Sequence, residues 1–92
     1  MFRYKLQFIG LGQEHKIKTN DIQKTFSEMA EVMKNDVYLG GVEIRLAEGN
    51  IEATIRLSPR KLFLFKGNED SRKFTEDYLM NELGQLKNMV TA

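Results

Sequence analysis

Residues 42–57 carry the pattern that most constrains this chain, because apolar and polar residues alternate through two short segments. Aliphatic residues alternate with charged ones at positions 42–46, and residues 51–57 continue the alternation. Successive side chains of a strand point to opposite faces of a sheet, so each segment has one apolar and one polar face. Glu-Gly-Asn at 48–50 suits a tight turn between them. The pattern predicts an antiparallel hairpin.

Two registers of this hairpin agree with the sequence. In one, residues 48–49 form the turn; in the other, residues 49–50 form it and Ile44 faces Ile55. Both registers place apolar residues opposite each other and offer a cross-strand charge pair, which contributes about 0.2–1 kcal/mol. A slip by one residue would place apolar side chains opposite charged ones, so the pattern opposes it.

A third strand is predicted to complete residues 42–66 as three consecutive antiparallel strands. Ser-Pro-Arg at 58–60 breaks the second strand, because proline cannot donate a hydrogen bond to the ladder. Residues 62–65, Leu-Phe-Leu-Phe, then follow without alternation. A short continuous apolar run is typical of a strand that is covered on both faces.

The remaining elements are predicted from periodicity and capping residues. Alternating aromatic and polar residues at 2–8 indicate a strand, and residues 14–18 form either a second strand or an extended connection. Helical spacing of apolar residues predicts a helix that is capped by Asn20 and ends near Asn35. A second helix is predicted to begin near Asn68, with Tyr78 and Leu79 both on its apolar side.

These elements predict a single α+β domain over residues 1–92, in the order β(β)αβββα. Strands that bury one face and helices that bury one stripe combine into a two-layer sandwich. We therefore expect an antiparallel sheet of four or five strands with two helices on one face. A chain of 92 residues is long enough to form a core without metals or disulfides.

Composition argues against several classes of function. There is no cysteine and only one histidine, His15, so neither a thiol nucleophile nor a thiolate metal site can form. No nucleotide-binding, metalloprotease or hydrolase motif occurs. We expect a protein that is not an enzyme and has no cofactor. The absence of a signal-peptide pattern and of any stretch of about 20 apolar residues predicts a cytoplasmic protein that does not enter a membrane.

The first functional hypothesis is protein–protein contact. If the helices cover one face of the sheet, either the leucine pair or the phenylalanine pair of residues 62–65 emerges on the other face. Such a patch would bind another protein or a second copy of the chain. We expect a homodimer, an adaptor, an inhibitor or a regulator of another protein. The predicted protein-binding residues are Leu62, Phe63, Leu64, Phe65, Tyr38 and Leu39.

The alternative hypothesis is nucleic-acid binding by the basic open face of the sheet. The formal net charge is only +1, but lysine and arginine exceed the acids in the predicted strands, whereas acids exceed them in the helices. A local field of this kind orients charged partners even when the total charge is small. The predicted nucleic-acid-binding residues are Arg3, Lys5, Arg45, Arg56, Arg60 and Lys61.

The order of elements from residue 20 to residue 90 is helix, three antiparallel strands, helix. This order resembles that of double-stranded-RNA-binding domains, whose second helix begins with a lysine-rich segment that contacts phosphates. The resemblance implies a similar role for the first turns of the second helix. In this chain Arg72 and Lys73 occupy that segment, after Glu69 and Asp70.

Overall fold

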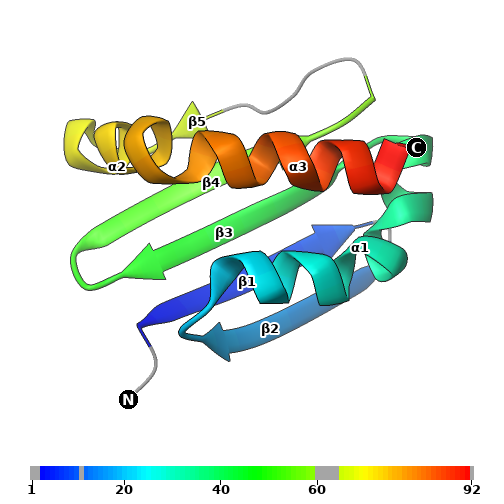
Figure 1. The fold of residues 1–92 in the computed structure, drawn as a ribbon, viewed down its shortest axis with the longest axis horizontal. Helices are drawn as coiled ribbons and strands as arrows, with labels where there is room; N and C mark the ends of the chain where they lie inside the picture. The colour runs from blue at the N-terminus through cyan, green and yellow to red at the C-terminus, as the bar shows by residue number, and fades with distance from the viewer. Residues whose placement is uncertain (1–2, 11, 60–64, 92) are drawn as a thin grey trace.

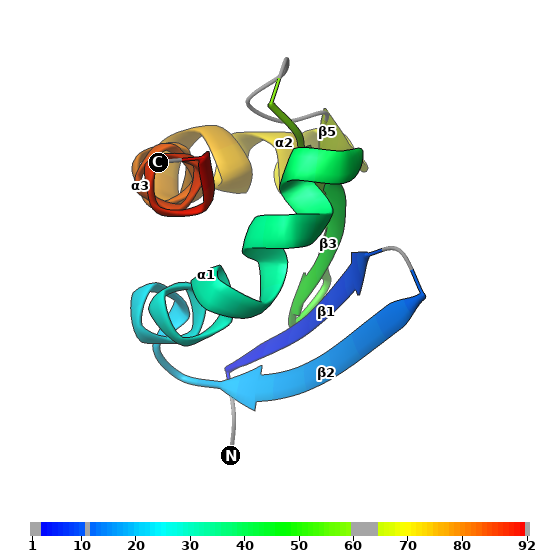
Figure 2. The same ribbon diagram turned by 90° about the vertical axis from the view of Figure 1, so that its right-hand side faces the viewer.

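The computed structural model describes residues 3–10, 12–59 and 65–91, which form one sheet covered by helices on one face (Figures 1 and 2). The strands are β1 (Tyr4–Gly10), β2 (Gln13–Thr19), β3 (Val42–Glu48), β4 (Ile51–Leu57) and β5 (Phe65–Lys66). The helices are α1 (Ile22–Leu39), α2 (Glu69–Phe74), the π-helical turn η1 (Thr75–Leu79) and α3 (Met80–Thr91). The predicted α+β sandwich with an antiparallel sheet is confirmed.

The sheet has the strand order β2-β1-β3-β4-β5, and all neighbouring strands are antiparallel. The segment at 14–18 is therefore a strand, within β2. The β3–β4 hairpin turns at Gly49-Asn50, so Ile44 pairs with Ile55. Gly49 has φ +56° whereas Asn50 has a negative φ, a pattern typical of the II′ turns that match the twist of a hairpin.

The third strand of the predicted trio differs from the expectation. Only Phe65–Lys66 is described as a strand, and it lies at the edge of the sheet, where it pairs with Thr54 and Ile55. The expectation that this apolar run is covered on both faces stays a prediction, since it concerns the side chains of residues 62–65. Residues 62–64 lie outside the described residues.

Helix α1 begins one residue later and ends four residues later than the sequence predicts. The cap is Asp21, whose carboxylate accepts a hydrogen bond from the Lys24 N–H at 3.0 Å, while the Asn20 side chain accepts one from the Arg3 N–H. The helix continues past Asn35 because Val37, one turn beyond Met33, is fully buried and extends the apolar stripe. Burial of Val37 outweighs the weak helix propensity of the segment.

The C-terminal helix contains a π-helical turn that the sequence did not predict. Because a π turn holds an extra residue, it rotates the apolar stripe relative to a continuous α-helix. Leu79 is consequently buried at 1% exposure, whereas Tyr78 is 67% exposed, so its predicted place in the core is wrong. The start of the helix is as predicted: Asn68 caps it by accepting a hydrogen bond from the Ser71 N–H at 2.8 Å.

The core lies between the sheet and the helices. Even-numbered residues of β1 and β3 and odd-numbered residues of β4 point into it, as the alternation predicts. The helices contribute the apolar side chains of their inner faces. Among the largest fully buried side chains are Phe8, Phe26, Leu6, Met33, Ile44, Ile55, Leu57, Leu79, Leu83 and Leu86.

Two glycines should respond oppositely to alanine. Gly41 has φ +116°, and a Cβ there would come within 2.8 Å of the Leu57 carbonyl oxygen, so Gly41→Ala should lower the free energy of unfolding by about 1–3 kcal/mol. Gly84 lies inside α3 with open space at its Cβ, so Gly84→Ala should raise it by about 0.5–1 kcal/mol. Urea unfolding of both variants tests the pair, and a stabilised Gly41→Ala would contradict the backbone explanation.

Candidate anion-binding groove on the open face of the sheet

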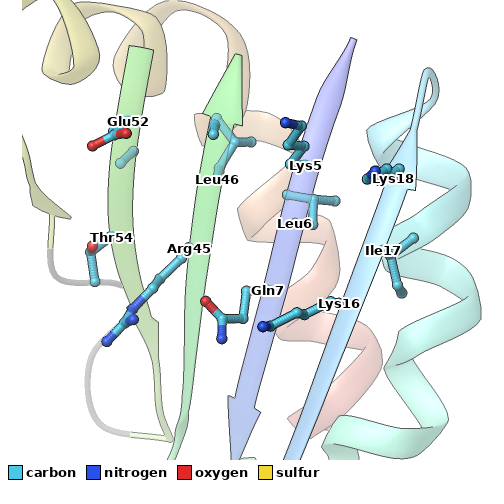
Figure 3. Close-up of a pocket in the computed structure, with 12 residues that line it drawn as sticks. Lys5, Leu6, Gln7, Lys16, Ile17, Lys18, Arg45, Leu46, Glu52 and Thr54 are labelled. Carbon is cyan, nitrogen blue, oxygen red and sulfur yellow. The ribbon is translucent and has the colours of Figure 1, made fainter. Parts of the chain in front are cut away.

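The sheet face that the helices leave uncovered contains a groove of about 660 Å³ (Figure 3). It crosses β2, β1, β3 and β4, and the close-up looks onto it with the helices behind the sheet. Its polar lining is basic at the β2 and β1 side and mixed at the β4 side. The groove is lined by Lys5, Leu6, Gln7, Lys16, Ile17, Lys18, Arg45, Leu46, Ala47, Glu52, Ala53 and Thr54.

The strand register arranges the outward side chains of the groove in two rows across the sheet. Residues that are directly opposite on neighbouring antiparallel strands lie on the same face, with Cβ atoms about 4.5–5.5 Å apart. The first row is Lys18, Lys5, Ala47 and Glu52. The second row is Lys16, Gln7, Arg45 and Thr54.

Lys5 and Lys18 are the most informative residues of the groove. They are directly opposite each other on β1 and β2, and like charges in that position destabilise a sheet. Within the described residues, neither lysine has an ion-pair partner. Both are exposed at the surface of the groove. The pair therefore adds no stability to the sheet and concentrates positive charge at the surface of the groove.

The other two cations of the groove, Lys16 and Arg45, each form a weak ion pair with an acidic residue of the same strand. The Lys16 ammonium is 3.5 Å from a carboxylate oxygen of Glu14, and the Arg45 Nε is 3.7 Å from that of Glu43. Both pairs are exposed, and such pairs typically contribute about 0–1 kcal/mol, so a polyanion can displace them at little cost. In Figure 3 the Lys16 side chain extends across β1 towards Gln7.

The polar lining of the groove is mainly cationic. Four of its lining side chains are cationic and one, Glu52, is anionic. Thr54 adds a hydroxyl donor in the second row, where the Gln7 side-chain amide donates a hydrogen bond to a carboxylate oxygen of Glu14. Cations lining one concave surface raise the local concentration of anions and accelerate their association. Glu52 lies at the β4 end, so positive charge is in excess on the β1 and β2 half.

Of the six residues predicted to bind nucleic acid, two line the groove, two lie outside the groove, and two lie outside the described residues. Lys5 and Arg45 line the groove together. Arg3 lies outside it and pairs with Glu48; this hydrogen bond is the main cause that raises the pKa of Arg3. Arg56 is exposed opposite Glu43 and is also outside the groove lining. Residues 60–61, the predicted Arg60 and Lys61, lie outside the described residues.

The residues predicted to bind protein are distributed differently from the expectation. Tyr38 and Leu39 are the last residues of α1, beyond the predicted end of this helix near Asn35, and they are 81% and 61% exposed. Phe65 is the first residue of the edge strand β5. The remaining predicted residues, Leu62, Phe63 and Leu64, lie outside the part of the chain that the structure describes.

Sequence reasoning did not include Lys16 and Lys18 among the site residues. The signal was present, because Glu14, Lys16 and Lys18 alternate with less polar residues and so occupy one face of a strand. What the alternation could not show was that β2 pairs with β1 in the register that sets Lys18 opposite Lys5. Arg72 and Lys73, at the start of the second helix, are exposed on α2 and away from the groove.

Other kinds of site were sought in the described residues. No group of three or more histidine, cysteine or acidic residues in residues 3–10, 12–59 and 65–91 could hold a metal ion. His15 lies on the helix-facing side of β2, and its Nε2 is buried without a hydrogen-bond partner in the described structure. None of the helices in these ranges is both long and apolar enough to cross a bilayer.

Comparisons with known proteins do not supply a relative from which a function could be transferred. The likeness to double-stranded-RNA-binding domains is one of element order, and shared order is weak evidence of function. Searches of protein-family models, of curated proteins and of solved structures found no match to this chain.

Proposed function

We propose that this domain binds nucleic acid through the groove on its open sheet face. The observation that carries the proposal is the pair Lys5 and Lys18, which lie directly opposite each other without an ion-pair partner in the described residues. Phosphates placed between them would remove the repulsion and provide the missing negative charge. Lys16 and Arg45 in the next row extend the cationic surface to a second position.

A polyanion with regularly repeated charges fits this surface better than a single small anion. Same-face side chains along one strand lie about 6.6 Å apart, at two rises of 3.3 Å, so Lys16 and Lys18 present separate contact points. Nucleic acids carry a negative charge at every nucleotide, and lysine contacts to phosphates supply sequence-independent affinity. The two rows across the groove therefore meet successive phosphates of one chain.

This proposal places nucleic-acid binding ahead of the apolar patch predicted from residues 62–65. The groove is built from described strands with a definite register, whereas most of that patch lies outside the described residues. Protein–protein contact is a separate proposal and concerns a different surface, the edge of the sheet at β2.

A double variant of groove residues outside β2 tests the function. Lys5→Gln with Arg45→Gln should weaken binding of a fluorescent oligodeoxythymidine and lower the slope of log affinity against log salt by about 2. The matched control is Lys24→Gln with Lys34→Gln, which removes the same charge from exposed positions on α1. Fluorescence anisotropy over a salt series measures both quantities, and circular dichroism checks folding.

Comparison of the two double variants shows whether binding depends on the charges in the groove or only on the net charge of the protein. If the groove is the site, the control pair should change the affinity by less than threefold and leave the salt slope unchanged. Equal losses in the two double variants, or no binding of single-stranded or duplex probes by the wild-type protein at low salt, would overturn the proposal.

A further inference from the structure

Strand β2 presents a long free edge. It has seven residues, Gln13–Thr19, and among the described residues it pairs only with β1, so its other side carries backbone N–H and C=O groups without a partner in that part of the chain. Its pairing with β1 is continuous, without a bulge, and the segment contains no proline. The opposite edge, β5, is only two residues long in the described structure. β2 is therefore the edge on which another strand can be added.

We propose that a second copy of this chain pairs with β2 in antiparallel orientation, about a two-fold axis at Lys16. The sheets of the two copies then join into one continuous sheet, with the helices of both on the same face. A two-fold interface is self-complementary, since the same residues meet from both sides. The charge pattern of β2 satisfies this requirement.

The charges of β2 match across the axis in this register. With Lys16 opposite its own copy, Glu14 faces Lys18 of the second copy, and the contact occurs twice by symmetry. Opposite charges directly across a strand pair stabilise it. The two Lys16 side chains meet at the axis, but each lies 3.5 Å from the Glu14 carboxylate of its own chain, which offsets their repulsion.

Neighbouring registers fit less well. An axis at Ile17 would place Lys16 opposite Lys18 twice, which adds repulsion on both sides. An axis at His15 would pair Glu14 with Lys16 but would leave Lys18 opposite Gly12, beyond the end of the strand, and so shorten the pairing. The axis at Lys16 is the one that pairs all seven residues of both strands.

Lysines on an edge strand also serve to prevent pairing. A strand guarded in this way would be expected to carry charges of one sign, because any approaching copy would then be repelled. β2 instead carries Glu14 four residues before Lys18, on the same face, which makes the edge complementary to itself. This placement favours a specific pairing over general repulsion.

Dimerisation would also extend the groove. The open faces of the two copies would be continuous, with Lys16 of both copies at the axis. In this dimer Lys18 would be paired with Glu14 of the second copy, so Lys5 would be the cation of the first row that has no acidic partner in the described residues. This consequence rests on the proposed nucleic-acid binding, whereas the dimer itself does not. The groove test above uses residues outside β2, so failure of one proposal leaves the other standing.

Charge reversal with rescue tests the interface and its register. Sedimentation equilibrium of the wild-type chain should show a concentration-dependent dimer. Glu14→Lys alone and Lys18→Glu alone should each raise the dissociation constant at least tenfold, because each creates two like-charge contacts. The double variant, Glu14→Lys with Lys18→Glu, should restore the dimer. A wild-type chain that stays monomeric at millimolar concentration, or single variants that dimerise like the wild type, would overturn the proposal.

Cysteine cross-linking gives a second measurement that does not depend on the reversed charges. Because the chain has no cysteine, a single Lys16→Cys substitution places the only thiol of each copy at the proposed axis. Directly opposite residues of paired strands lie within the Cα separation of about 4.4–6.8 Å that a disulfide spans. Oxidation should link Lys16→Cys rapidly into dimers, whereas Lys24→Cys on α1 should stay largely monomeric. Equal rates would contradict the interface.

Discussion

Replacing Phe26 with alanine should lower the free energy of unfolding by about 3–5 kcal/mol. Phe26 is 1% exposed and meets the buried ring of Phe8 edge to face, with the ring centroids 6.2 Å apart. Truncation removes this contact and opens a cavity between α1 and β1. A domain of this size has a total stability of about 5–15 kcal/mol, so the variant should be close to unfolding at room temperature.

Urea unfolding followed by circular dichroism measures this effect. The matched control is Tyr38→Ala, which removes an aromatic side chain from the same helix at an exposed position. Surface substitutions usually change stability by no more than about 0.5 kcal/mol, so Tyr38→Ala should leave the midpoint nearly unchanged. Similar costs for the two variants would show that the α1 face is assigned wrongly.

Replacing Ser71 with alanine should lower the free energy of unfolding by about 1–3 kcal/mol, although only one oxygen is removed. Ser71 is fully buried on α2, and its Oγ accepts a hydrogen bond from the Glu52 backbone N–H at 3.1 Å. In the described structure β5 pairs with β4 only at Thr54 and Ile55, so the helix supplies the partner that Glu52 needs. Loss of the hydroxyl leaves this partly buried donor without its partner.

Ser27→Ala is the control for this substitution. Ser27 is exposed on α1, and its hydroxyl donates to the Gln23 carbonyl within the same helix. The chemical change is identical, but water can replace the lost hydrogen bond, so the expected effect is within about 0.5 kcal/mol. Thermal unfolding of both variants separates burial from the serine-to-alanine change itself. A Ser71→Ala variant as stable as Ser27→Ala would contradict the role assigned to the Glu52 N–H.

Structural features that depend on residues close together in the sequence could be predicted from it. The β3–β4 hairpin follows from alternation and from a Gly-Asn turn, and the confirmed register was one of the two that the pattern allowed. The start of the second helix near residue 68 follows from the helical spacing of its apolar residues. The π turn at Thr75–Leu79 and the last turn of α1 were missed, because packing against the sheet decides both and neither has a local signature.

The candidate site was predictable only in part. Lys5 and Arg45 were identified because alternation places them on the polar face of their strands. Alternation also places Arg3 and Arg56 on that face, but it does not show which basic residues become neighbours. Residue contacts across a sheet depend on strand order and register, and β1 pairs with β3 across more than 30 residues of chain.

The sequence by itself determined the strand faces, the hairpin, the helix starts near residue 20 and at residue 68, and the α+β class. These depend on periodicity and capping, which act over a few residues. Only the tertiary structure decided that β1 lies between β2 and β3, so that Lys18 meets Lys5 and four strands form one basic groove. It also left β2 at a free edge. Both results arise from pairing between distant segments, where burial of the shared core, rather than local preference, selects the neighbour.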